Sequence, residues 1–184
     1  GPAQDKPIIL MNGKAHLGNG EVIENSAIAF EDGKLTIVGD ATTMRIDMEK
    51  FEVIDCQGKD VYPGLIATNT QLGLVEIGAV RATHDENEVG GMNPNVRSLI
   101  AYNTDSRVSS TVRSNGIMIA QVAPTGGRIS GSSSVVHLDA WNWEDAALRA
   151  DDGIWLNWPS WFSRRGWWAE PGPTEKNKRY DEQV

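Results

Sequence analysis

Closely spaced turn signals divide residues 7–61 into short apolar runs. The signals are Asn12-Gly13, Gly18-Asn19-Gly20, Asp32-Gly33, Gly39-Asp40 and Gln57-Gly58, and the runs are Ile8 to Met11, Ala27 to Phe30, Leu35 to Val38 and Phe51 to Ile54. These runs are too short for core helices and carry β-branched residues, so they are predicted to be strands. A few short strands bury little apolar surface. Residues 7–61 therefore predict a β-sheet module, made largely of hairpins, that needs a second layer.

The residue pattern changes from Val61 onward, where the pattern of a parallel sheet begins. Val61 to Ala67 is a compact apolar run that predicts a buried strand, with Pro63 near its start, where a missing N–H is tolerated. A long polar loop, residues 81–95, follows. Residues 95–114 show helical spacing that closes at Asn115-Gly116 as a helix C-cap does. Ile117 to Val122 predicts the next strand. Strand, helix, strand is the βαβ unit of parallel sheets.

The segment after this unit predicts a further strand of the same sheet. The Gly-rich loop Gly126 to Ser132 has backbone N–H groups that suit an anion, but it matches no nucleotide-binding pattern, and an ordinary βα connection is the simpler interpretation. Val135 to Leu138 is a third strand-like run. All seven tryptophans lie in the last 44 residues, and Pro171 to Val184 is polar, as in an exposed helix or a linker.

The segment Pro63 to Leu74 carries the most chemical information. Residues two apart on a strand point to the same side, so Ala67, Asn69 and Gln71 are expected to share one face near the strand's carboxyl end. In an α/β barrel that end is the functional one.

From about residue 7 into the 130s, the chain resembles the imidazolonepropionase-like branch of the amidohydrolase superfamily. The resemblance is carried by the segments Glu31 to Gly39, Val53 to Ile66, Asn115 to Ala120 and Gly126 to Ser132, in the family's order. It implies a composite β-sheet followed by an eight-stranded barrel, and a first barrel strand ending in Asp-x-His-x-His. In the family, those histidines bind a divalent metal, often zinc, which activates water to attack amide or cyclic amide C–N bonds.

This chain departs from the family at that motif. Ala67, Asn69 and Gln71 stand where the family has aspartate and two histidines. A neutral amide oxygen is a weak zinc donor, and a methyl group supplies no anion to orient the ligands. The simplest interpretation is that Asn69 and Gln71 line a vestigial pocket. Weak metal binding, or hydrogen bonding to a substrate, is the alternative.

Other candidate site residues rest on less specific patterns. His84, in the acidic sequence His84-Asp85-Glu86, and His137, in an apolar run, are weak metal candidates; a solvated loop and a core histidine are the simpler interpretations. Arg128, Trp155 and Trp158 are candidates for substrate binding. The tryptophans suit a glycan or aromatic ligand, or burial against a partner chain, which we favour.

Charge and composition exclude several classes of function. The net charge of −8 argues against nucleic-acid binding, which needs clustered Lys and Arg. No run approaches the roughly 20 apolar residues of a transmembrane helix. Cys56 is the only cysteine, so an internal disulfide is impossible. Gly1-Pro2 is typical of a cleaved tag. If residues 3–6 follow a removed signal peptide, the protein is periplasmic or secreted; a cytoplasmic location is the alternative.

The sequence therefore predicts an α/β protein with a β-sandwich module. Residues 7–61 are expected to form an N-terminal composite β-sheet, and residues 62–184 the first strands, about three, of an incomplete (β/α)8 TIM-type barrel. We expect the remainder of the barrel, or a second amidohydrolase-like chain, as partner. Zinc is possible only if that portion supplies ligands. The functional alternatives are a single-metal hydrolase, a non-catalytic structural subunit, and a Trp-rich binding module for a glycan or a partner protein.

Overall fold

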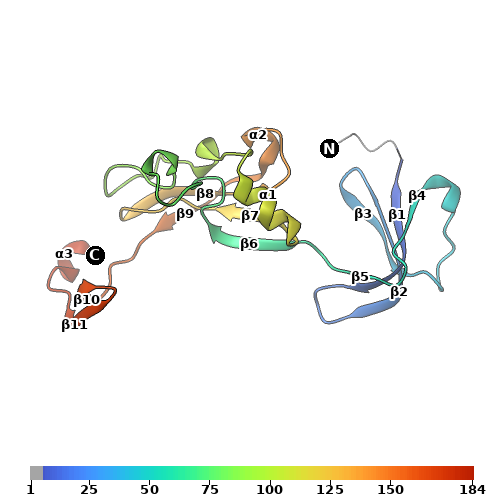
Figure 1. Cartoon of the computed structure of the whole chain (residues 1–184), viewed down its shortest axis with the longest axis horizontal. Helices are drawn as coiled ribbons and strands as arrows, with labels where there is room; N and C mark the ends of the chain where they lie inside the picture. The colour runs from blue at the N-terminus through green and yellow to red at the C-terminus, as the bar shows by residue number, and fades with distance from the viewer. Residues whose placement is uncertain (1–5) are drawn as a thin grey trace. The chain divides into compact units, whose positions relative to one another are not determined.

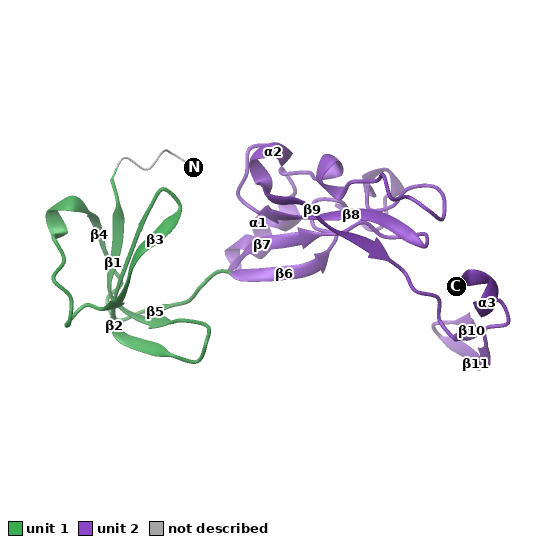
Figure 2. Cartoon of the chain, turned by 180° about the vertical axis from the view of Figure 1, so that it is seen from behind, with its two compact units in different colours: residues 1–64 green, residues 65–184 purple. Residues whose placement is uncertain are grey.

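The computed structural model describes residues 6–184, which form mostly β structure in mixed sheets with few helices. Figure 1 shows the elements along the chain, and Figure 2 shows the two units into which it divides, Gly1–Gly64 and Leu65–Val184. The predicted tag remnant Gly1-Pro2, and residues 3–5 of the predicted mature N-terminus, lie outside the described residues. Within the described residues, no helix has the length and apolar character to cross a membrane.

Unit 1 is a five-stranded sheet in which four strands match the predicted runs and the short fifth strand was not predicted. Its strands are β1 (Ile8–His16), β2 (Val22–Glu31), β3 (Lys34–Asp40), β4 (Glu52–Asp55) and β5 (Asp60–Val61), and a 3₁₀ helix covers Met48–Lys50. The order is β3-β2-β1-β4, with β5 also beside β1. The β1–β2 and β2–β3 pairs are antiparallel hairpins, whereas β4 and β5 run parallel to β1. The expected β-sheet module is therefore present, although only two of its four strand pairs are hairpins.

The turn signals of unit 1 have two different outcomes. Asp32 and Gly33, both with positive φ, form the two-residue turn between β2 and β3, as predicted. The Asn12-Gly13 signal does not end a strand: β1 continues through it, and the register with β2 shifts on both sides of Gly13. Asn12 has φ 56°, so the dipeptide forms a bulge within a strand rather than a turn.

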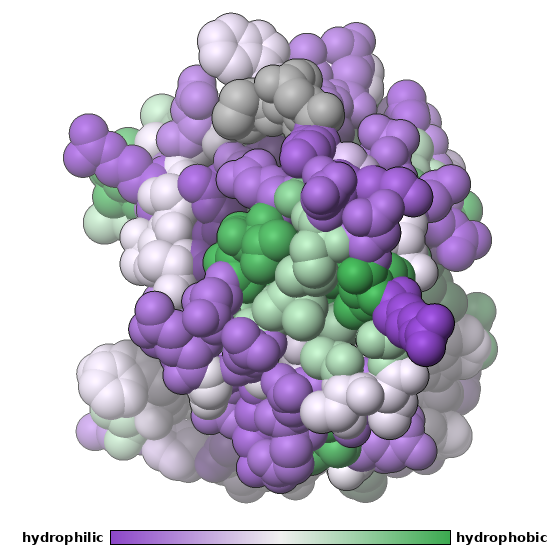
Figure 3. Space-filling view, turned by 90° about the vertical axis from the view of Figure 1, so that its right-hand side faces the viewer, coloured by the Kyte–Doolittle hydropathy of each residue, from purple (hydrophilic) through white to green (hydrophobic). Residues whose placement is uncertain are grey.

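Unit 1 buries a small core and leaves other apolar side chains exposed. Ile9, Ala27 and Ala29 are fully buried, and Ile37 and Phe51 pack against them. Exposed apolar side chains on β3 and β4 are those of Leu35, Val38, Val53 and Ile54. In Figure 3, apolar side chains gather in a patch on one face of the molecule with hydrophilic side chains around it.

Unit 2 contains a four-stranded sheet and a separate hairpin. The sheet strands are β6 (Leu65–Thr70), β7 (Ile117–Val122), β8 (Ile129–His137) and β9 (Ala147–Leu156), in that order, and the hairpin pairs β10 (Phe162–Trp167) with β11 (Glu170–Lys176). The helices are α1 (Arg107–Ser114), α2 (Trp143–Ala146) and α3 (Tyr180–Gln183), and 3₁₀ helices cover Arg81–Thr83 and Ser98–Ala101.

The predicted strand–helix–strand unit is present at β6, α1 and β7. β6 and β7 are parallel, α1 contacts β7, and Asn115 caps the helix before Gly116, which has φ 90°. The helix covers only the end of the expected 95–114 segment. The predicted buried strand Val61 to Ala67 is wrong: residues 62–64 separate β5 from β6, and Leu65 and Ile66 at the start of β6 are 60% and 61% exposed.

The predicted third parallel strand is also wrong. Val135 to Leu138 lies mostly within β8, which is antiparallel to β7, and β9 is antiparallel to β8. The loop Gly126 to Ser132 is therefore not a βα connection, because its second half already belongs to β8 and no helix follows it. The parallel arrangement stops after two strands, and the described residues form no barrel. Pro171 to Val184, expected to be helix or linker, forms β11 and α3.

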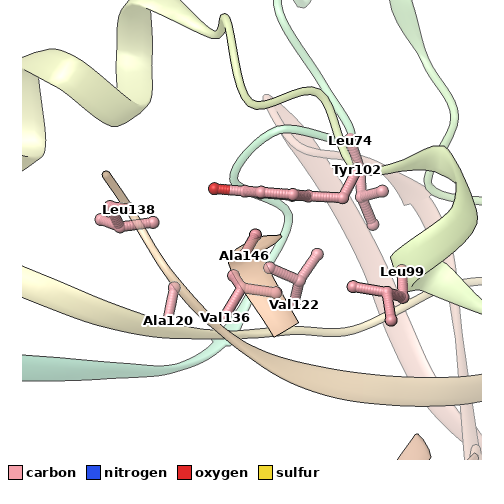
Figure 4. Packing of buried hydrophobic residues seen from close by; sticks show 8 residues of the cluster. All are labelled: Leu74, Leu99, Tyr102, Ala120, Val122, Val136, Leu138 and Ala146. Carbon is pink, nitrogen blue, oxygen red and sulfur yellow. The ribbon is translucent and has the colours of Figure 1, made fainter. Parts of the chain in front are cut away.

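The core of unit 2 lies against β7 and β8. Figure 4 shows the buried cluster, in which the ring of Tyr102 lies above side chains from the sheet and from α2. The cluster consists of Leu74, Leu99, Tyr102, Ala120, Val122, Val136, Leu138 and Ala146. These residues come from β7 and β8, from Leu138 just after β8, from α2 and from the segment between β6 and α1. This core fixes the carboxyl ends of β6 and β7, where the candidate site lies.

Candidate functional site at the carboxyl ends of the parallel strands

The backbone of β6 departs from regular strand geometry at Asn69. Asn69 has φ 52°, in the left-handed region. The pairing with β7 passes from Ala67–Ala120 to Thr70–Val122, so three steps on β6 oppose two on β7. Gln71 lies beyond the strand, in a turn where its carbonyl oxygen accepts from the N–H groups of Leu74 and Val75. The prediction that Ala67, Asn69 and Gln71 share one strand face is wrong, because this bulge breaks the alternation.

A hydrogen-bonded series of polar groups begins at the same strand end. The main-chain N–H of Asn69 donates to Gln121 Oε1 of β7 over 3.3 Å. Gln121 Nε2 donates to Asp152 Oδ2 of β9 over 2.8 Å, and Ser133 Oγ of β8 donates to Asp152 Oδ1 over 2.6 Å. The four sheet strands thus each contribute one group. We call Asn69 N–H, Gln121, Asp152 and Ser133 the strand-end relay.

Sequence reasoning missed three members of this relay. Gln121 is the only polar side chain in the apolar run Ile117 to Val122, and that contrast is a usable signal. Asp152 and Ser133 belong to β9 and β8, whose antiparallel return beside β7 was not expected. Ser133 is fully buried, and its hydroxyl also lies 3.2 Å from the carbonyl oxygen of Gly153, a second acceptor.

A second polar group surrounds His84 in the loop after β6. His84 Nδ1 lies 3.1 Å from Glu86 Oε1, and His84 Nε2 lies 3.3 Å from the carbonyl oxygen of Ile77. The hydrogen bond with Glu86 raises the pKa of His84. Glu86 Oε2 is buried and has no hydrogen-bond partner among the described residues. Both residues line an open groove of about 710 Å³, together with Arg81 and Glu88.

The neighbouring acids do not complete a metal site around His84. The carboxylate of Glu88 accepts from the N–H of Val89, and the main-chain N–H of Asp85 donates to the carbonyl oxygen of Leu74. Across residues 6–184, no cluster of three or more His, Cys, Asp or Glu side chains is placed to hold an ion. One imidazole and one carboxylate fall short of the three or four protein ligands of a zinc site.

The remaining predicted residues lie at separate places. His137 Nε2 donates to the carbonyl oxygen of Asp145, 2.7 Å away. Arg128 Nη1 donates to the carbonyl oxygen of Asn157 just after β9, and the half-buried Trp155 lies within β9. Trp158 Nε1 donates to the hydroxyl of Tyr180, which stacks on Trp161 with ring centroids 4.0 Å apart. Trp158 thus contacts Tyr180 in an aromatic group with Trp161, just before the β10–β11 hairpin, whereas Arg128 and Trp155 belong to the β8–β9 region.

The donor set at the strand ends does not fit the metal that the family resemblance implies. The side chains at positions 67, 69 and 71 are a methyl group and two neutral carboxamides, and carboxamides are poor zinc ligands. The bulge at Asn69 removes the common face on which ligands two residues apart converge. Asp152, the nearby carboxylate, already accepts from Gln121 and Ser133.

Comparison with known proteins gives partial similarity to one enzyme family. No protein-family model matches the chain. The chain is 29% identical to an imidazolonepropionase of Brucella anthropi over 113 residues, covering 56% of this chain and 28% of that protein. It is 47% identical to an imidazolonepropionase of Bacillus mycoides over 51 residues, covering 28% of this chain and 12% of that protein. The chain thus spans less than a third of the length of these curated relatives.

The structure is similar to an amidohydrolase from Thermotoga maritima MSB8. The TM-score is 0.74 at 20% identity, and the match covers 83% of this chain and 39% of that chain. At this identity, the likeness concerns the fold. Together, the partial sequence similarity and the structural match confirm the resemblance to amidohydrolases that the sequence predicted.

Proposed function

Because this chain is related to amidohydrolases in part of its sequence and in its fold, we propose that it serves a structural, non-catalytic role in a larger amidohydrolase-like assembly. The observation that carries the proposal is the donor chemistry at the end of β6. Zinc-activated water needs imidazole or anionic ligands at the ion. Ala67, Asn69 and Gln71 offer neither kind of ligand.

The free edge of β6 supports the assembly part of the proposal. Within the described part of the chain, β6 pairs with β7 alone, so its other edge presents unpaired backbone groups. The exposed side chains of Leu65 and Ile66 lie on the same strand. We infer that further parallel strands join at this edge, supplied by the remainder of the barrel or by a second amidohydrolase-like chain.

The competing function is hydrolysis of amide or cyclic amide C–N bonds with a single metal held by ligands outside these residues. Elemental analysis of the intact assembly, purified without affinity metals and dialysed against buffer, separates the two. If the role is structural, the measured content of zinc, manganese and iron should each be far below one ion per assembly. One equivalent of any of these metals, together with hydrolysis of a cyclic amide such as an imidazolone, would overturn the proposal.

A second candidate function rests on the aromatic side chains around the hairpin. Trp168 is 89% exposed, and Trp167 lies beside it, edge to face, with ring centroids 5.5 Å apart. Arg164 and Arg165 line the same hollow of about 250 Å³. Exposed tryptophan beside arginine is the composition of binding hot spots. This observation favours a binding module for a glycan or a partner protein.

A binding screen tests this second candidate. Glycan arrays and peptide libraries are probed with the full chain, with Trp168→Ala, and with Trp141→Ala as a matched control, because Trp141 is equally exposed but lies outside the hairpin. Loss of a bound ligand in Trp168→Ala alone, with unchanged melting temperature, supports a binding role for the hairpin. Equal binding by all three proteins would remove this candidate.

A further inference from the structure

The strand-end relay has a fixed direction of hydrogen bonding, set by a group that can only donate. The N–H of Asn69 belongs to the main chain, so the Gln121 atom that faces it over 3.3 Å is the carbonyl oxygen Oε1. The amide nitrogen Nε2 of Gln121 therefore points to Asp152 and donates over 2.8 Å. The atom of residue 152 that faces Gln121 Nε2 must therefore be an acceptor, as a carboxylate oxygen is.

The far side of Asp152 is also occupied by a donor. Ser133 Oγ donates to Asp152 Oδ1 over 2.6 Å, a short distance typical of a charge-assisted bond. Both oxygens of Asp152 are thus engaged, one by β7 and one by β8, while Asp152 itself belongs to β9. The carboxylate is held on two sides by neutral donors in a half-buried setting.

We propose that Gln121 and Asp152 are positioning residues that cross-link the carboxyl ends of the parallel strands by hydrogen bonds, in the place where the family resemblance implies a metal. The relay joins β7, β8 and β9 through side-chain groups and holds the bulged backbone of β6 by the hydrogen bond from the Asn69 main-chain N–H to Gln121. The cross-link itself stands on the distances above, and only its comparison with a metal rests on the amidohydrolase relation.

The direction of the relay makes a double-substitution test possible. Gln121→Glu places a second carboxylate against Asp152, where two anions face each other without a proton between them. Adding Asp152→Asn restores every bond. One carboxylate oxygen of Glu at position 121 accepts from the Asn69 N–H, and the other accepts from the carboxamide nitrogen at position 152. The carboxamide oxygen at position 152 accepts from Ser133. The second substitution repairs the first.

The single substitution Asp152→Asn is expected to be milder. The Ser133 hydroxyl has a second acceptor in the carbonyl oxygen of Gly153, so it can turn and accept from a carboxamide nitrogen at position 152. The carboxamide oxygen then accepts from Gln121 as the carboxylate did. The effect of Asp152→Asn thus depends on the residue at position 121: it lowers stability beside glutamine and raises it beside glutamate.

Thermal unfolding of the full 184-residue chain at pH 7 measures this dependence. Gln121→Glu is expected to lower the melting temperature by about 5 °C or more, and Asp152→Asn on that background to recover most of the loss. Lowering the pH toward 4 is expected to recover part of it in Gln121→Glu alone, because the two carboxyl groups then share a proton. If Gln121→Glu does not fold, recovery of folding in the double variant supports the relay equally well.

Two outcomes would overturn the proposal. One is a fall in melting temperature on Asp152→Asn both beside Gln121 and beside glutamate at position 121. A relay of fixed direction requires the change in melting temperature to have opposite signs in these two backgrounds. The other concerns the metal: the melting temperature of the unsubstituted chain is expected to stay within one or two degrees after treatment with a chelator or with one equivalent of zinc. A rise of several degrees with zinc that is abolished in Gln71→Ala would place a metal cross-link at this end instead.

Discussion

Arg97 binds the carboxylate of Asp151 through two of its nitrogens, with Nε 2.9 Å from Oδ1 and Nη2 2.7 Å from Oδ2. Asp151 has φ 50° and immediately precedes Asp152 in β9. The two adjacent carboxylates therefore have different partners: Asp151 ties β9 to the loop before α1, and Asp152 ties it to β7 and β8.

The Arg97–Asp151 contact should make stability depend on acid pH. Hydrogen bonds from Arg97, and then from Ser132, hold the pKa of Asp151 below its usual value of 3.8. The stabilising contribution is therefore complete above that value and is lost as the pH falls through the lowered pKa. Arg97→Gln should lower the melting temperature at pH 7 and have less effect near pH 3. Arg149→Gln is the control, because Arg149 is exposed and lies on β9 with Asp151; its effect on the melting temperature should show no such pH dependence.

The His84–Glu86 pair should have the opposite pH dependence. Because the hydrogen bond with Glu86 raises the pKa of His84 above 6.5, its stabilising contribution is complete below that value and is lost as the pH rises through the raised pKa. His84→Gln should therefore destabilise the chain more at pH 5.5 than at pH 8.5. An NMR titration of the His84 ring measures the pKa directly. A value at or below 6.5, or an unchanged value in Glu86→Gln, would contradict this assignment.

Gly73 should not tolerate a side chain. It has φ 71°, and a Cβ atom there would lie 2.5 Å from the ring of Tyr102, a member of the unit 2 core. We expect Gly73→Ala to destabilise the chain by more than about 1 kcal/mol, combining backbone strain and displacement of the ring. Gly78→Ala is the matched control, because its Cβ would meet no atom within 4 Å. Denaturant unfolding measures both. Equal effects of the two substitutions would refute the steric argument.

Restoring the family's motif residues should not restore a metal site. Two imidazoles and a carboxylate are enough donors for zinc when they converge. In this chain the bulge at Asn69 prevents positions 67, 69 and 71 from facing one way. The triple substitution Ala67→Asp, Asn69→His and Gln71→His should therefore retain no stoichiometric zinc after dialysis. One zinc per chain, measured by elemental analysis, would show that the strand end adapts to the ligands.

Local signals predicted much of this structure because local chemistry determined it. The strands of unit 1, the hairpin turn at Asp32-Gly33 and the helix end at Asn115-Gly116 follow from residue types and their spacing. The misassigned features depend on pairing between distant segments. Whether β8 runs parallel or antiparallel to β7 is not encoded in the apolar run Val135 to Leu138 alone, because both arrangements bury the same side chains.

The sequence singled out Asn69 and Gln71 of the candidate site, but neither the geometry of the site nor Gln121, Asp152 and Ser133. Asn69 and Gln71 stood out because they replace histidines in a recognisable motif. Their directions were not predictable, since one residue in the left-handed region changes every later position on the strand. Asp152 was out of reach of sequence reasoning, because a residue 83 positions beyond Asn69 joins the site only through the β8–β9 return.

The order of the four-stranded sheet leaves it two outer edges among the described strands, one on β6 and one on β9. β7 already has a neighbour along each edge, β6 on one side and β8 on the other. An incoming strand that leaves the described pairs intact can therefore add only along β6 or along β9. Addition beside Leu65–Thr70 would extend the parallel pair β6–β7, in the reverse of the order in which these strands occur along the chain.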